Sequence, residues 1–263
     1  MNAHRDPIPR IDVLGVGISA INMKMAVDEI TRWIDEGEHH YVCVTGVHGV
    51  MESQRDPELL RIHNESGLTT PDGMPMVWSA RWAGSRHVDR VYGPDLMLEV
   101  CRVAADRGWT SYFYGGKQGV PEMLAKRLQE SFPGLKVVGA YSPPFRDLTD
   151  QEQSDIVARI NQADPELVWV GLSTPKQERW VAGHIGKLRA PALLAVGAAF
   201  DLHAGTLRQA PRWMQRSGLE WLYRLYREPR RLWHRYFTII PRFLAAIVRR
   251  RPRPLAIGRE SER

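Results

Sequence analysis

The residues of this chain best suited to chemistry are carboxylates and amides that follow expected strands. Asp72 lies in the turn of "TTPDGMPMVW", between an extended segment and the start of an apolar helix. Asp-Gly is above all a turn signal, but a carboxylate held at a cleft can also act as a general base. Both interpretations of Asp72 stay open on this segment alone.

Three other segments place polar or glycine residues where strands end. "GGKQG" begins with Gly115 and Gly116, whose N–H groups could approach an anion at a helix start, although a plain turn explains it equally well. "GLSTPKQERW" puts Gln177 and Glu178 in the first turn of a helix, where a ligand would lie. "AAFDLHAG" places Asp201 where it could bond a ribose hydroxyl or a base, or merely stabilise its own turn.

Several other kinds of chemistry lack their sequence motifs. There is no Cys/His metal-ligand spacing, no H-E-x-x-H and no G-x-S-x-G elbow. We therefore expect no metal and no cofactor. Another nucleotide-binding α/β enzyme, such as a nucleotide-sugar-modifying oxidoreductase, remains an alternative. The absence of G-x-G-x-x-G with a downstream ribose-binding acid counts against NAD.

The elements that must position these residues alternate along the chain. Apolar runs predict strands at 11–19, 41–45, 110–115, 135–141, 166–172 and 191–199. Helical patterns occupy 22–37, 47–66, 119–131, 150–162 and 175–189, the first with Asn22 as N-cap and Gly37 as its stop. Strands buried on both faces that alternate with helices predict a Rossmann-like α/β parallel sheet, with its ligand beyond the carboxyl ends of the strands.

The last part of the chain has a different character. From residue 208 onward there are 15 arginines against 4 glutamates, a net charge of +11, whereas residues 1–207 carry a net charge of −5. Apolar and arginine residues recur at helical spacing, so we predict two or three short amphipathic helices interrupted at Pro229 and Pro241. We divide the chain into a catalytic domain (1–207) and a basic appendage (208–263).

The charge of the appendage calls for an anionic partner. Nucleic-acid binding is one hypothesis, but the long apolar face suits an anionic membrane surface better, so we expect no nucleic acid. Two cysteines, no leader-like apolar segment and no long apolar run favour a cytoplasmic protein bound peripherally to the inner face of the membrane. A homo-oligomer is left open.

Taken in order, these segments resemble the WecG/TagA/CpsF glycosyltransferase family from about residue 11 to residue 236. The most specific blocks are "VGLSTPKQERW" and "SGLEWLYRLYREPRRLWHRY". The resemblance implies an inverting, metal-independent transfer of a sugar (of ManNAc, glucose or glucuronate type) from a UDP-sugar donor. The acceptor would be a polyprenyl-diphosphate-linked saccharide, in cell-surface polysaccharide or teichoic acid synthesis.

Roles follow from the resemblance where residues match. It implies that Asp72 is the base, that Gln177 and Glu178 line the nucleotide-sugar pocket, and that Asp201 lies near the nucleoside. The arginines that it implies as a cap over the leaving diphosphate are Arg224, Arg231 and Arg235.

Two positions depart from the pattern of the family. Many members have Thr-x-Asn after the second strand, and we assign Thr45 to substrate binding there, but His48 follows Gly46 and Val47. Gln209 stands where many members have arginine, which puts any phosphate contact at that position in doubt. The first departure suggests a different donor sugar or acceptor.

Overall fold

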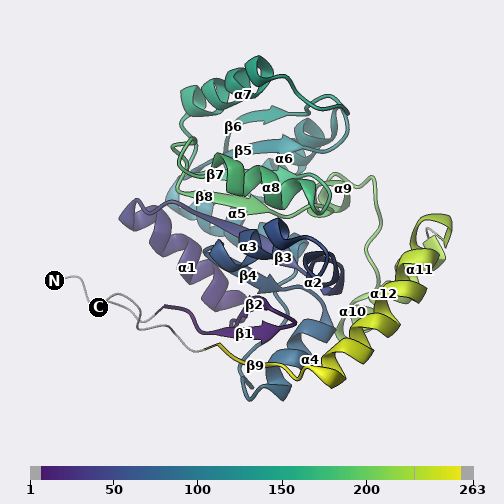
Figure 1. Ribbon diagram of the computed structural model, residues 1–263. Coiled ribbons are helices and arrows are strands. Elements are labelled where there is room, and N and C mark those ends of the chain that lie inside the picture. Colours follow the sequence, from purple (N-terminus) through teal and green to yellow (C-terminus); the bar gives the residue numbers. More distant parts are fainter. Residues whose placement is uncertain (1–6, 228, 256–263) are drawn as a thin grey trace, which may run out of the picture.

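The protein is built on a six-stranded parallel sheet. The computed structural model describes residues 7–227 and 229–255, except the side chains of residues 212, 216, 230, 231 and 234–236. The strands, in spatial order, are β4 (Leu68–Pro71), β3 (His40–Thr45), β8 (Ala192–Ala195), β7 (Leu167–Gly171), β5 (Thr110–Gly115) and β6 (Lys136–Tyr141). The predicted Rossmann-like α/β fold is confirmed (Figure 1).

Helices cover both faces of this sheet. One face packs against α1 (Met23–Glu36), α5 (Gly93–Arg107), α6 (Val120–Ser131) and the short α9 (Ala199–His203). The other packs against α3 (Pro57–Glu65), α7 (Asp150–Ala163) and α8 (Lys176–His184). The strands are therefore apolar on both sides, which is why they read as continuous apolar runs.

The ends of α1 follow from local sequence as expected. The side chain of Asn22 accepts a hydrogen bond from the N–H of Met25 at 3.1 Å. Gly37 adopts the left-handed conformation, with φ 67°, and ends the helix. Both predicted caps of α1 are confirmed.

The strand expected over 11–19 is wrong, because this segment is an antiparallel hairpin of β1 (Arg10–Val13) and β2 (Val16–Ser19). Leu14 and Gly15 both have positive φ, at 56° and 92°, as a tight two-residue hairpin turn requires. The Asp12 carboxylate accepts a hydrogen bond from the N–H of Gly15 and stabilises this turn. The hairpin is difficult to recognise from the sequence because its turn, with leucine at the first position, lies inside a continuous apolar run.

The single helix expected over 47–66 is also wrong, because two helices form there, α2 (Val47–Ser53) and α3. Pro57 begins α3, and the Asp56 side chain caps it by accepting from the N–H of Leu59 at 3.0 Å. A proline fits the first turn of a helix but not its interior, so the chain reverses before it.

The C-terminal part forms α10 (Arg212–Arg216), α11 (Glu220–Arg227), α12 (Pro229–Arg249) and β9 (Arg253–Pro254). Residue 228, between α11 and α12, lies outside the described residues, so the break predicted at Pro229 stays a prediction. The break predicted at Pro241 is wrong, since α12 continues through it. Pro241 leaves one helical carbonyl without its N–H, while Phe243 and Ile247 bury their side chains against α2 and α4 (Met74–Trp82). That burial holds the helix together across the proline.

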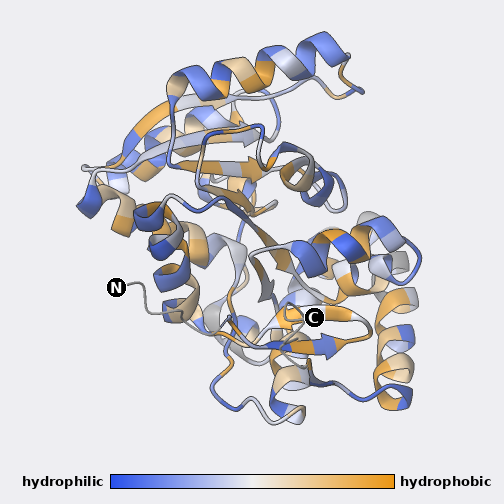
Figure 2. Cartoon of the chain, turned by 60° about the vertical axis from the view of Figure 1, so that its left-hand side comes forward, coloured by the Kyte–Doolittle hydropathy of each residue, from blue (hydrophilic) through white to orange (hydrophobic). Residues whose placement is uncertain are grey.

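The end of the chain returns to its beginning, because β9 pairs with β1. Arg250 also forms an ion pair with the buried Asp12 at 2.8 Å. Figure 2 shows alternating polar and apolar bands along α12. None of the helices in residues 7–227 and 229–255 is long and apolar enough to cross a membrane.

Candidate active site

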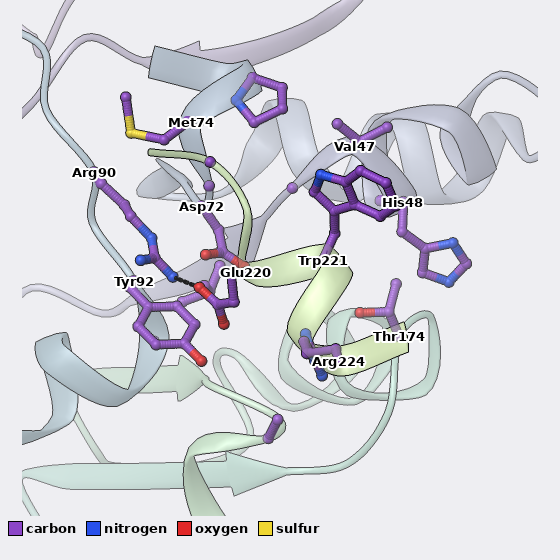
Figure 3. Close-up of a pocket in the computed structure, with 18 of the residues that line it drawn as sticks. Val47, His48, Asp72, Met74, Arg90, Tyr92, Thr174, Glu220, Trp221 and Arg224 are labelled. Carbon is purple, nitrogen blue, oxygen red and sulfur yellow. Dashed lines mark hydrogen bonds and ion pairs between the residues drawn. The ribbon is translucent and has the colours of Figure 1, made fainter. Parts of the chain in front are cut away.

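A cavity of about 760 Å³ opens at the carboxyl ends of β3, β4, β7 and β8, where the fold predicts a ligand. Helices α2, α4, α11 and α12 contribute most of the remaining wall, together with Gln177 of α8 and residues of the segments 90–94 and 215–219. Its polar or chemically active lining residues include His48, Asp72, Arg90, Tyr92, Thr174, Gln177, Gln215, Glu220 and Arg224. Figure 3 shows Asp72, Arg90, Tyr92 and Glu220 close together, with His48 on the other side of Trp221.

Asp72 lies directly after β4, on the wall of this cavity. Its N–H donates to the carbonyl of Thr45 at 3.1 Å, which joins the ends of two neighbouring strands. A Cβ at position 46 would come within 3.0 Å of the Asp72 carbonyl oxygen, so glycine at Gly46 permits this close approach. The turn role of Asp72 and its position in the cavity are therefore compatible.

The electrostatic surroundings of Asp72 suit a base. Burial raises the pKa of its carboxyl to about 6. Arg90 and Arg224 act in the opposite sense, and the negative charge of Glu220 adds to the increase. A carboxylate with a pKa near 6 is ionised at neutral pH and is a stronger base than an ordinary aspartate.

Arg90 and Glu220 form an ion pair beside Asp72 that the sequence did not lead us to expect. Their side chains meet at 2.5 Å, only 12% and 17% exposed (Figure 3). The guanidinium of Arg90 also lies 3.9 Å over the ring of Tyr92. Arg90 Nε is buried and has no hydrogen-bond partner within the described part of the chain. The sequence feature that could have pointed to Arg90 is its place in "DRVYGP", next to Tyr92 in a segment that resembles the family.

Gln177 and Glu178 lie in the first turn of α8, as predicted, and both are buried. Gln177 lines the cavity, and its amide donates to Glu178 Oε1 at 3.2 Å. Thr174 donates to the same oxygen at 2.9 Å, and burial raises the pKa of Glu178. Gln177 Oε1 has no partner among the residues described, so it is available to a donor in the cavity.

Arg224 reaches the cavity from α11 (Figure 3). The side chains of Arg231 and Arg235 lie outside the described part of the structure, so their predicted roles stay predictions. Leu232, on the same helix, lines the cavity. Of the three arginines, Arg224 is the one whose described side chain lines the cavity, and its role in a cap stays a prediction.

Four other expected binding residues do not line this cavity. The Thr45 hydroxyl is buried and donates to the Cys43 carbonyl at 3.3 Å. The N–H of Gly116, next to Gly115, donates to a strand carbonyl at 2.8 Å, so this amide is occupied. Asp201 accepts a hydrogen bond from Thr206 at 3.0 Å, as the turn interpretation predicts. Substrate contacts for Thr45, Gly115, Gly116 and Asp201 stay predictions.

The two departures from the family pattern occupy different places. His48 lines the cavity from the first turn of α2, with Nδ1 3.8 Å from Glu52 Oε1. Gln209 lies outside the main cavity and donates to Gln215, a lining residue, at 3.5 Å. His48 is therefore the departure that a substrate would meet.

No group of three or more histidine, cysteine, aspartate or glutamate side chains that could hold a metal ion occurs in the described residues. Cys43 and Cys101 are free and buried in separate strand and helix positions. The charged groups that act on Asp72 are two arginines, Glu220 and, as the weakest of the four, Asp95.

A parallel sheet with a cavity at its carboxyl edge, lined by a carboxylate and two arginines, has its site where α/β proteins of this topology bind their ligands. Residues 11–256 match the model of the glycosyl transferase WecG/TagA/CpsF family. The chain belongs to this family and is a glycosyltransferase. The alternative of an oxidoreductase is thereby set aside.

Curated relatives agree with this assignment. An N-acetylglucosaminyldiphosphoundecaprenol N-acetyl-beta-D-mannosaminyltransferase of Bacillus subtilis (strain 168) is 26% identical over 236 residues, covering 87% of this chain and 90% of the relative. Enzymes of the same name from Bacillus spizizenii and Staphylococcus aureus (strain MW2) are each 24% identical. They cover 83% and 87% of this chain, and 82% and 89% of their own lengths.

Proposed function

We propose that the protein transfers an N-acetylhexosamine, of the N-acetylmannosamine type, from a UDP-sugar to a polyprenyl-diphosphate-linked saccharide. The names of the relatives support this donor sugar and acceptor. The observation that carries the proposal is the position of Asp72, with a pKa of about 6, in a cavity beside Arg90 and Arg224.

The proposed reaction is a single displacement with inversion. An acceptor hydroxyl oxygen attacks the anomeric carbon, and the bond from that carbon to the UDP oxygen breaks. Asp72 takes the hydroxyl proton, while UDP leaves with the bonding electrons. A positioned base of this kind contributes roughly 10²–10⁴-fold to the rate.

The departing diphosphate gains negative charge, which cationic donors must stabilise. Arg90 and Arg224 both line the cavity, and guanidinium groups bind phosphate oxygens through paired hydrogen bonds. A diphosphate oxygen near Arg90 would also accept from the buried Nε–H that has no partner among the described residues. Gln177 is the proposed polar contact to the donor from α8.

We further propose that helices α11 and α12 rest on the inner face of an anionic membrane, where a lipid-linked acceptor lies. Apolar side chains of α11 and α12 face solvent: Leu222, Tyr226, Trp233, Phe237, Leu244 and Val248. The arginines of these helices would meet anionic headgroups, each worth about 1 kcal/mol near such a surface. Flotation with anionic vesicles, which should carry the protein upward, and a gel shift with RNA, which should not, test this choice.

A panel of UDP-sugars tests the donor. Purified protein is incubated with UDP-ManNAc, UDP-glucose, UDP-glucuronate or UDP-galactose and a GlcNAc-diphosphate-prenyl acceptor. We expect transfer from UDP-ManNAc to exceed that from the others. Transfer from none of the four would refute the proposal. A clear preference for another donor would refute the assignment of N-acetylmannosamine as the transferred sugar.

A further inference from the structure

The proposed sugar chemistry leaves one part of the cavity wall without a role. It is formed by apolar side chains of α4 and α12: Met74, Pro75, Trp78, Trp82, Ile239, Ile240, Phe243, Leu244 and Ile247. Sugar hydroxyls and diphosphate oxygens need hydrogen-bonding partners, and apart from the indole N–H groups of the two tryptophans these side chains supply none. The apolar wall, so defined, therefore calls for a hydrocarbon ligand.

The apolar wall runs from the polar end of the cavity to the surface. At one end Trp78 lies close to Gly218, in the turn before α11: a Cβ there would be 2.9 Å from the indole. At the other end the Trp82 ring lies 5.7 Å from the guanidinium of Arg251, just beyond α12. Figure 1 shows α4 beside the end of α12. The wall thus leads outward from the α11 side of the site.

Side chains of this wall meet solvent, although they are large and apolar. Trp78 and Trp82 are each 52% exposed, and Leu244 is 56% exposed. Below them Phe243 and Ile247 are buried in the cluster that joins α12 to α2 and α4. Exposed apolar groups that converge on one concave space beside a few polar groups are typical of a ligand site.

We propose that the apolar wall binds the first isoprene units of a prenyl diphosphate, whose diphosphate lies where the wall meets the polar end of the cavity, beside the turn that contains Gly218. The inference rests on the proposed function, since it specifies how that acceptor would be held. A ligand with a charged head and a hydrocarbon chain matches a cavity with arginines at one end and an apolar wall at the other. The wall is also continuous with the site of Asp72, so a chain bound there would leave the attached sugar near the base.

Calorimetry with simple probes tests the site without any turnover. We expect farnesyl diphosphate, used below its micelle concentration, to bind at least about tenfold more tightly than inorganic diphosphate. Leu244→Asn should reduce this advantage about fivefold or more and leave diphosphate binding unchanged. Equal affinities of the two probes for the native protein would overturn the proposal.

Val248→Asn is the matched control. Val248 lies one turn further along α12 and is 66% exposed, but it does not line the cavity. We expect the Val248→Asn variant to bind farnesyl diphosphate like the native protein. An equal loss of affinity in both variants would indicate nonspecific binding to the apolar surface of α12 and would contradict the site. Dodecyl phosphate with the same advantage over inorganic phosphate would contradict a prenyl-specific wall. A dimer in sedimentation that Leu244→Asn dissociates would assign the wall to a second copy of the chain.

The outcomes separate this inference from the proposed function. Tight farnesyl diphosphate binding without transfer from any UDP-sugar would support the prenyl site and refute the proposed function. Equal kcat/KM for acceptors with a methyl and a farnesyl group on the diphosphate would remove the site and leave the function standing.

Discussion

Replacing Asp72 by asparagine separates catalysis from stability, because the two should change in opposite directions. The variant keeps the shape of the side chain and loses its charge and its basicity. Transfer should fall by roughly 10²–10⁴-fold, the usual contribution of a general base, while the affinity for UDP-sugar changes little. In the native protein, kcat/KM should rise with pH through about 6, the pKa of this carboxyl.

The stability change follows from the same pKa. The folded state raises it from 3.8 to about 6, so folding favours the protonated form. The corresponding stability is present below about pH 4 and is lost as the pH rises through about 6. At about 1.4 kcal/mol per pKa unit the full cost of the ionised group is about 3 kcal/mol. Allowing for solvent in the cavity, we expect about 1–2 kcal/mol.

Thermal unfolding at two pH values measures this term. At about pH 8 the Tm of Asp72→Asn should exceed that of the native protein by about 3–6 °C, and at about pH 4 the two should agree. Asp106→Asn, at a carboxylate that is 72% exposed on α5, serves as the control and should change little at either pH. A Tm difference for Asp72→Asn that is the same at both pH values would refute the argument from burial, and near-native turnover would refute the role as base.

Three further changes test the surroundings of the site. Glu220→Gln removes a negative charge that raises the pKa of Asp72, so the acid limb of the pH–rate profile should move to lower pH; an unchanged profile would exclude this coupling. Gln177→Leu removes the amide that faces the cavity and should raise the KM for the donor about tenfold with little change in Tm, whereas an unaltered KM would place the donor elsewhere. Asp12→Ala leaves Arg250 without its buried partner and should cost about 1–3 kcal/mol in urea unfolding, and a smaller loss would show that β9 pairing alone holds the end of the chain.

Much of the fold could be predicted because its signals are local. Asn22 caps a helix with its own side chain, and Gly37 ends that helix because glycine tolerates positive φ. Strands such as β7 are apolar throughout because helices cover both faces of the sheet. The position of Gln177 after a predicted strand indicated, through the parallel topology, that it would reach the carboxyl edge of the sheet, and Asp72 was expected at a cleft; both line the cavity.

The errors arose where distant packing outweighs local preference. Leu14 adopts a positive φ that leucine rarely adopts, so Gly15 was the only turn residue in the sequence that indicated the hairpin. Pro241 stays inside α12 because burial of Phe243 and Ile247 offsets the lost hydrogen bond. The spacing of apolar residues along the chain predicts neither the backbone conformation of Leu14 nor the burial that stabilises α12.

The sequence by itself determined the parallel sheet, the residue types at its carboxyl edge and the cationic, amphipathic character of the last helices, because each depends on neighbours within a few positions. Only the tertiary structure decided which of these residues act together. Arg90 and Glu220 are far apart in the chain and meet at 2.5 Å beside Asp72. The pKa of Asp72 depends on its burial and on the nearness of those charges. Glu220 and Arg224 come near Asp72 only once α11 lies across the ends of the strands.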